Sequence, residues 1–130
     1  MIEGVGSEIK GGSNTPLPTM NQKEFETKIE ELMKVVNKTL KGKGVEYQTN
    51  KDVFSNFITL GEQLDLTEYQ VWSVYFSKHI FSIQNAIKNF PDNPDNNLAE
   101  PLDSRITDAV AYLFLLYGMS KRNKHPIDNN

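Results

Sequence analysis

Apolar side chains recur at helical spacing in three long stretches of this chain and in one short stretch. From about residue 22 to residue 40 they fall at i, i+4, i+7, i+8, i+11 and i+15, which places them on one face of a helix. The stripe consists of Phe25, Ile29, Leu32, Met33, Val36 and Leu40. Asn21 followed by Glu24 predicts an N-terminal cap, and Gly42 and Gly44 predict the C-terminal end. We expect this stripe to be buried.

Residues 43–50 are polar and predict a loop, and two further helices follow it. A short helix is predicted near residues 52–60, carrying two phenylalanines and two aliphatic residues. The next helix begins after Thr67, where Gln70 completes a capping box, and ends before Pro91, which cannot continue it. Its apolar face is formed by Val71, Trp72, Tyr75, Phe76, Ile80, Ile83, Ala86 and Ile87. Residues 92–97 are rich in turn-forming types and predict a loop.

The last helix is predicted from a cap at Asp103 to about Lys121 and is apolar on nearly every side. A helix of that kind lies in the middle of its domain. Arg105, Asp108 and Tyr112 interrupt it at i, i+3 and i+7, so all three project from one face. Because an unpaired buried charge is costly, these groups either lock the helix to its neighbours or line a polar pocket. The apolar run at residues 113–117 exceeds what one small bundle covers and predicts a homo-oligomer, with a homodimer as the simplest case.

The fold class predicted from these patterns is all-α. No stretch shows sustained alternation of period two, and long helices joined by loops of this length favour an antiparallel bundle. We expect one helical domain over residues 19–122, built from three long helices and one short helix. Residues 1–18, which are rich in glycine and proline, and residues 123–130, which are polar, predict flexible tails.

Composition narrows the class of protein further. The net charge of −3 and the isoelectric point near 5.4 argue against binding to duplex nucleic acid. Lys38, Lys41, Lys43 and Lys51 lie close in sequence, although such a group is more often a solvated surface. The absence of cysteine excludes disulfides and thiolate metal sites and favours a reducing compartment. The longest apolar run is far shorter than the roughly 20 residues of a membrane span, and the chain does not begin like a signal peptide, so we expect a cytoplasmic protein with no membrane contact.

Candidate chemistry is sparse. Glu26 and Glu30 flank the buried stripe of the first helix, where solvation is the simpler explanation, and we expect no metal and no cofactor. His79 lies near the apolar face of its helix, and histidine can act as an acid or base near neutral pH. No nucleophile stands at a recognisable spacing, and no glycine-rich phosphate loop is present. Tyr47 or Trp72 could stack on a nucleobase at the rim of a polar pocket.

Four segments together resemble a group of small bacteriophage and prophage proteins and the phage-encoded nucleotide-modification-associated domain family. They are residues 43–47 (Lys-Gly-Val-Glu-Tyr), 52–57 (Asp-Val-Phe-Ser-Asn-Phe), 78–82 (Lys-His-Ile-Phe-Ser) and 105–112 (Arg-Ile-Thr-Asp-Ala-Val-Ala-Tyr). The likeness spans roughly residues 24–120 and implies a location in the host cytoplasm and a role at or near nucleotides. The ligand-facing set that it implies is Lys43, Glu46, Tyr47, Asn56, Lys78, His79, Arg105 and Asp108. A more distant likeness is to all-α nucleotide pyrophosphohydrolases of the MazG type, although their paired Glu-x-x-Glu motif has no counterpart on the expected helix.

Three functions remain open from the sequence. The first is a protein that binds, and in a phage setting sequesters, a phosphorylated nucleotide or a nucleotide-derived defence signal, with Lys78 and Arg105 on the phosphate. The second is a non-enzymatic helical interaction module in which Arg105 and Asp108 form a structural ion pair. The third is an enzyme of nucleotide metabolism or base modification that uses His79 with Asp108 or Glu46 as acid and base.

Overall fold

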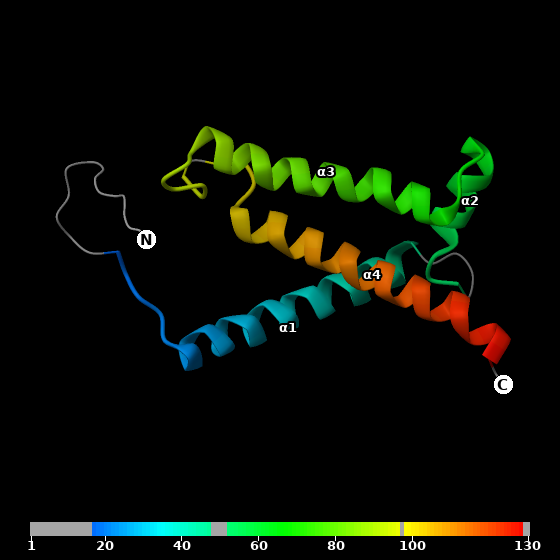
Figure 1. The fold of residues 1–130 in the computed structure, drawn as a ribbon, viewed down its shortest axis with the longest axis horizontal. Helices are drawn as coiled ribbons and strands as arrows, with labels where there is room; N and C mark the ends of the chain where they lie inside the picture. The colour runs from blue at the N-terminus through cyan, green and yellow to red at the C-terminus, as the bar shows by residue number, and fades with distance from the viewer. Residues whose placement is uncertain (1–16, 48–51, 97, 129–130) are drawn as a thin grey trace. The chain divides into compact units, whose positions relative to one another are not determined.

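The computed structural model describes residues 17–47, 52–96 and 98–128, and the side chains in these ranges except those of residues 43–47 and 125–128. This part of the chain contains four helices and no strand: α1 (Gln22–Tyr47), α2 (Ser55–Leu64), α3 (Glu68–Asn89) and α4 (Leu102–Asp128) (Figure 1). The all-α class, with three long helices and one short one, is confirmed. The chain divides into two units, residues 1–30 and 31–130, with the boundary inside α1. Within the described ranges, none of the helices combines the length and apolar character that a membrane crossing requires.

Capping residues fix the starts of α1 and α3 as the sequence predicts. The Asn21 amide donates to Glu24 Oε1 at 2.9 Å, and the Glu24 amide donates back to Asn21 Oδ1 at 2.8 Å. At α3 the Thr67 amide donates to Gln70 Oε1 at 2.8 Å, while the Gln70 amide donates to Thr67 Oγ1 at 3.1 Å. Each pair satisfies amides that the first turn of a helix leaves without intrahelical partners, so both predicted starts are confirmed.

The predicted end of the first helix is wrong. α1 continues through Gly42 and Gly44 to Tyr47, and it includes residues 43–47, for which the sequence predicted a loop. A glycine inside a helix costs only about 1 kcal/mol relative to alanine, which favourable neighbours on either side can outweigh. Residues 48–50, the remainder of that predicted loop, lie outside the described residues, as does Lys51.

Helix α2 starts and ends later than predicted, at Ser55 and Leu64 instead of near residues 52 and 60. Asp52 lies before the helix, and its Oδ1 accepts a hydrogen bond of 2.8 Å from the Phe54 amide, which forms a side-chain turn. The residue after the helix is Asp65, whose φ of 59° places it in the left-handed region. Aspartate tolerates that conformation better than most residues, so it serves here as a C-terminal cap.

Both ends of α4 also differ from expectation. The helix begins at Leu102, whose amide donates to Asp95 Oδ1 at 2.8 Å, so the cap comes from the preceding loop and the predicted cap, Asp103, lies inside the first turn. At the other end α4 runs to Asp128, through six residues assigned to a polar tail; residues 129–130 lie outside the described residues, as do residues 1–16 of the predicted N-terminal tail. Side chains at positions 122 and 123 bind α3, which anchors the helix beyond residue 121.

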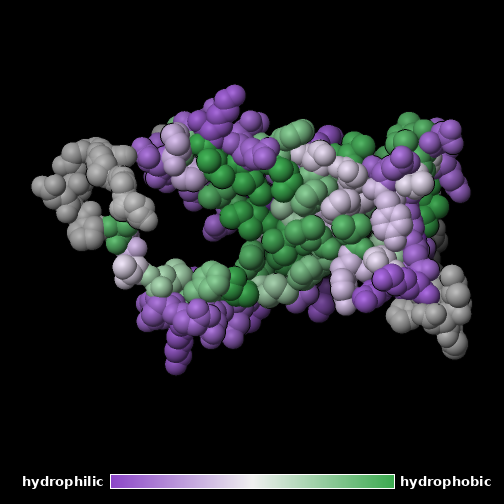
Figure 2. Space-filling model, in the orientation of Figure 1, coloured by the Kyte–Doolittle hydropathy of each residue, from purple (hydrophilic) through white to green (hydrophobic). Residues whose placement is uncertain are grey.

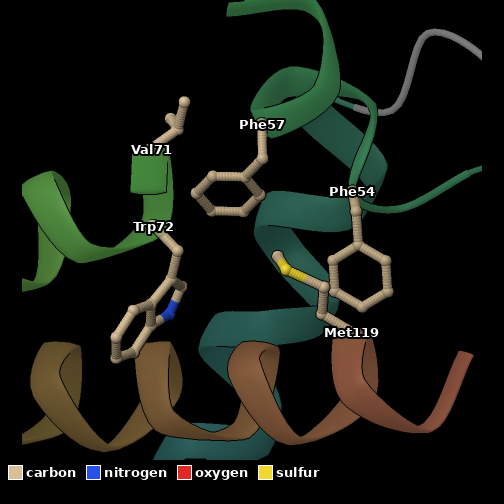
Figure 3. Packing of buried hydrophobic residues seen from close by; sticks show 5 residues of the cluster. All are labelled: Phe54, Phe57, Val71, Trp72 and Met119. Atoms are coloured by element: carbon tan, nitrogen blue, oxygen red, sulfur yellow. The ribbon is translucent and has the colours of Figure 1, made fainter. Parts of the chain in front are cut away.

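The core lies where α2 and α4 meet α3. Figure 3 shows Phe57 of α2 and Phe54 just before it, Val71 and Trp72 of α3, and Met119 of α4 packed together. Trp72 Nε1 donates to the Tyr112 carbonyl at 2.7 Å, and its ring stacks on that of Phe76 at 4.7 Å between centroids. A buried indole requires such a partner for its N–H, so the tryptophan contributes both apolar area and register between α3 and α4.

Two of the predicted buried stripes are buried only in part. On α1, Val36 has no exposed surface, but Phe25 and Ile29 are 51% and 41% exposed, so that expectation is wrong for the first half of the helix. On α3, the face predicted from the sequence is fully buried only at Val71, Trp72 and Ala86, while Ile87 is exposed. An apolar stripe marks the side of a helix that can be buried, but the packing of neighbouring helices determines how much of that side is buried.

The glycines provide a matched test of these helices. Gly61 is buried, and a Cβ placed on it would lie 2.5 Å from the Leu66 carbonyl oxygen, whereas a Cβ on Gly42 meets nothing within 4 Å. We expect Gly61→Ala to lower the free energy of unfolding by about 1–3 kcal/mol through overpacking against the backbone. Gly42→Ala should instead leave it unchanged or raise it by up to about 1 kcal/mol. Urea denaturation of the two variants measures both effects; equal effects of the two substitutions would contradict this packing.

Candidate functional site

The seam between α3 and α4 brings together three of the eight residues predicted to face a ligand. His79 lies on α3, where its ring contacts Tyr112 of α4, and Arg105 of α4 donates to the Ser82 carbonyl one turn further along α3. The antiparallel register is set by contacts along the seam, with Ser82 beside Arg105 and Trp72 beside Tyr112. The predicted stripe at positions 105, 108 and 112 therefore does face a neighbouring helix.

The Arg105 side chain donates hydrogen bonds to two main-chain carbonyl groups. Its Nη1 donates to the Ser82 carbonyl of α3 at 2.7 Å, and its Nε donates to the Glu100 carbonyl at 2.9 Å. Among the ion pairs of the described residues none joins Arg105 to Asp108, which does not support the structural ion pair considered from the sequence. The arginine locks α4 to α3 and to the loop before α4, which is one of the two roles that the sequence left open.

His79 and Tyr112 form the centre of an aromatic group on the same seam. Their ring centroids lie 4.6 Å apart, and the Tyr112 ring also contacts those of Phe57 and Tyr75 at 6.2 and 6.5 Å. Burial raises the pKa of the Tyr112 phenol, and the neighbouring Tyr75 and Asp108 raise it further. Tyr112 is therefore held in its neutral form, as expected of a packing residue.

The other members of the predicted set do not join this seam. Lys78 is exposed, with Nζ 5.7 Å from the centroid of the Tyr75 ring, and Asn56 is exposed on α2. Lys43, Glu46 and Tyr47 lie in the last turns of α1, where the side chains are outside the described residues. In the described part of the chain, the predicted residues are thus brought together only in part.

The structure reveals a polar cluster that the sequence analysis missed. Arg122 of α4 binds Glu68 at the start of α3 and Asp52 before α2, with an Nη1–Oδ2 distance of 3.0 Å to the aspartate. Asn123 extends the cluster, since its Nδ2 lies 2.9 Å from both Glu68 Oε2 and the Tyr69 hydroxyl. The guanidinium also lies over the Phe54 ring at 5.0 Å. The sequence analysis missed this cluster because Arg122 and Asn123 are polar residues that follow the apolar run of α4, as in a solvated tail.

The opposite charges of this cluster stabilise the fold by holding three segments of the chain together. Burial by itself lowers the pKa of Arg122, but the hydrogen bond and charge of Glu68, followed by those of Asp52, outweigh it and raise the pKa above its ordinary value. Glu68 Oε1 is buried without a hydrogen-bond partner, so this carboxylate depends on Oε2 and its arginine for compensation. One guanidinium thereby ties the segment before α2 and the start of α3 to the last turns of α4.

A shallow, open hollow of about 580 Å³ lies beside α1, away from the seam, and the described residues that line it are all exposed. The described residues that line it are Lys34, Asn37, Lys38, Lys41 and Gly42, all on one helix face. In the described ranges, no group of three histidine or acidic side chains is placed to hold a metal ion. The structure therefore presents a basic surface at this hollow and an aromatic, hydrogen-bonded seam at α3 and α4.

Comparison of the chain with protein-family models, with curated proteins and with solved structures finds no match. The likeness to phage-encoded nucleotide-modification proteins thus stays a prediction from the sequence. Any statement about activity has to come from the residues and geometry above.

The two possible roles of Arg105 can be separated by mutation. Because charge-assisted hydrogen bonds to backbone carbonyls contribute about 1.5–3 kcal/mol, we expect Arg105→Gln to lower the free energy of unfolding by an amount in that range. Asp108→Asn should cost less than about 0.5 kcal/mol, because Asp108 forms no ion pair with the arginine. Urea denaturation of both variants checks this, and comparable losses would restore the ion-pair interpretation.

The raised pKa of Tyr112 predicts a loss of stability at alkaline pH. Below the ordinary tyrosine pKa of about 10, the phenol is protonated in both the folded and the unfolded chain, so the contribution is constant. As the pH rises past that value, the unfolded chain releases the proton first, and the free energy of unfolding falls until the higher pKa of the folded state is reached. We expect Tyr112→Phe to remove this part of the fall in urea denaturation between about pH 9 and 11. The matched variant Tyr117→Phe, at an exposed position, should retain it.

Proposed function

We propose that this protein is a non-enzymatic helical interaction module that works as a homodimer joined through α4. The observation that carries the proposal is the exposure of large apolar side chains on α4, within residues 106–120, a stretch with a single charged residue. Tyr117 and Leu113 are 67% and 46% exposed. The chemistry-bearing residues of the seam are engaged in holding α3 and α4 together, which supports an interaction role over turnover.

The exposed positions belong to a regular pattern. Ile106, Val110, Leu113, Tyr117 and Ser120 are spaced by four, three, four and three residues, which is the spacing of a seam between two paired helices. Ile106, Val110 and Ser120 are half-buried, so the pattern is most exposed in its middle, at Leu113 and Tyr117. Figure 2 shows apolar residues gathered over α3 and α4 on the face turned toward the viewer.

A second copy of the chain is the partner that suits this exposed face of α4. The only charged residue between positions 106 and 120 is Asp108, which lies on the same stripe as Arg105 and Tyr112, toward α3. The outward face of α4 thus places no like charges opposite each other when it meets itself across a twofold axis. Apolar area without charge is the composition that distinguishes homodimer interfaces from ordinary surface.

The test is the oligomeric state of two matched double variants. We expect the wild-type chain to sediment as a dimer and Leu113→Glu/Tyr117→Glu to sediment as a monomer, because two buried carboxylates per copy would be left unpaired in the interface. Val74→Glu/Phe81→Glu is the control, since those side chains are 57% and 60% exposed on α3. It should remain dimeric.

Analytical ultracentrifugation over a concentration series, with circular dichroism to verify the helical content, gives the readout. A wild-type chain that stays monomeric at high concentration would refute the proposal. Dissociation by the control pair as readily as by the α4 pair would also refute it, because the interface would not then be specific to α4.

A further inference from the structure

We propose that the lysine face of α1, defined as Lys34, Asn37, Lys38, Lys41 and Gly42, binds the polyphosphate of a nucleotide-type ligand. The proposal rests on the hollow that these residues line and on their charge, and it is independent of the dimer. None of these five positions belongs to the ligand set suggested by the sequence. They are within residues 31–130, the unit that also contains α2, α3 and α4.

The lysine face concentrates positive charge on an acidic protein. Between Glu31 and Glu46 the sequence holds four lysines and no acidic residue, in a chain with a net charge of −3. Lys34, Lys38 and Lys41 recur at i, i+4 and i+7, so they lie on one side of the helix over about 10 Å of its axis. Like charges at this spacing repel each other, and a bound anion relieves that repulsion.

The spacing favours an extended anion with several charges. A single phosphate is too small to approach all three ammonium groups over two turns of helix, whereas a chain of two or three phosphates can lie along them. Lysine meets phosphate as a flexible point charge, so the three side chains can adjust to such a chain. Asn37, in the middle of the face, adds a neutral amide that can donate and accept hydrogen bonds.

The floor of the hollow suits the remainder of a nucleotide. Lysine side chains keep their charged ends in water while their aliphatic stems lie along the surface. Gly42 leaves the backbone open, since a Cβ at this position would meet nothing within 4 Å. A sugar and base can therefore rest on the stems and the exposed backbone while the phosphates meet the ammonium groups.

Calorimetric titration of the full chain with three probes tests the proposal: inorganic triphosphate, a nucleoside triphosphate and the corresponding nucleoside. We expect both phosphate probes to bind and the nucleoside alone not to bind. The nucleoside triphosphate should bind more tightly than inorganic triphosphate because it also uses the floor of the hollow. Affinity should fall as ionic strength rises, as for any exposed charge interaction.

Two variants and a control locate the site. Lys34→Gln/Lys38→Gln/Lys41→Gln should weaken binding by about tenfold or more through lost charge. Gly42→Met should weaken it with all charges retained, because the new side chain occupies the hollow. The control Lys23→Gln/Lys88→Gln/Lys124→Gln removes the same charge from exposed positions elsewhere and should leave affinity unchanged.

The unfolding temperature of each variant without ligand shows that it is folded. Absence of binding by every phosphate probe would overturn the proposal, as would an equal loss of affinity in the control triple variant. Equal affinity for inorganic and nucleoside triphosphate would overturn the assignment to a nucleotide. The oligomeric state measured for the α4 variants is a separate readout, so either proposal can fail without the other.

Discussion

The contacts of α4 with the rest of the core depend on the antiparallel register between α3 and α4, which three side chains fix at three levels. Arg105 of α4 donates to the Ser82 carbonyl near one end, Trp72 of α3 donates to the Tyr112 carbonyl in the middle, and Arg122 binds Glu68 at the other end. Two of these bonds use main-chain carbonyls as acceptors, so they hold one helix to the backbone of the other. Packing of apolar side chains alone tolerates small slips between helices, whereas such hydrogen bonds do not.

This register determines which groups remain available for function. The seam engages Arg105, places the His79 ring against Tyr112 and raises the pKa of the Tyr112 phenol. A set of polar residues that suggested a ligand site in the sequence becomes the element that aligns two helices. We propose two surfaces for partners: the outward face of α4, which is apolar and uncharged, and the lysine face of α1, which is basic.

The two arginines of the described region illustrate why residue type alone does not reveal a binding site. Arg105 and Arg122 both lie on α4, and the planar guanidinium of either could hold a phosphate. In the structure both act within the fold, one on carbonyl oxygens and the other on carboxylates. Lys34, Lys38 and Lys41 of α1 line the open hollow, and their flexible side chains suit an exposed anion better than a fixed structural role.

The class of the fold, the number of helices and the starts of α1 and α3 follow from the amino-acid sequence, because helical periodicity and capping boxes are local properties of the chain. The sequence also predicted that positions 105, 108 and 112 would share a face toward a neighbour. Packing between helices was needed to show that α1 continues past Gly42, that α4 continues past Lys121, and that Phe25 and Ile29 are exposed while Val36 on the same stripe is buried. It alone joined Arg122 to Glu68 and Asp52, which lie 54 and 70 residues away. Contacts over such separations depend on how helices pack, and the spacing of residues along one helix carries no information about them.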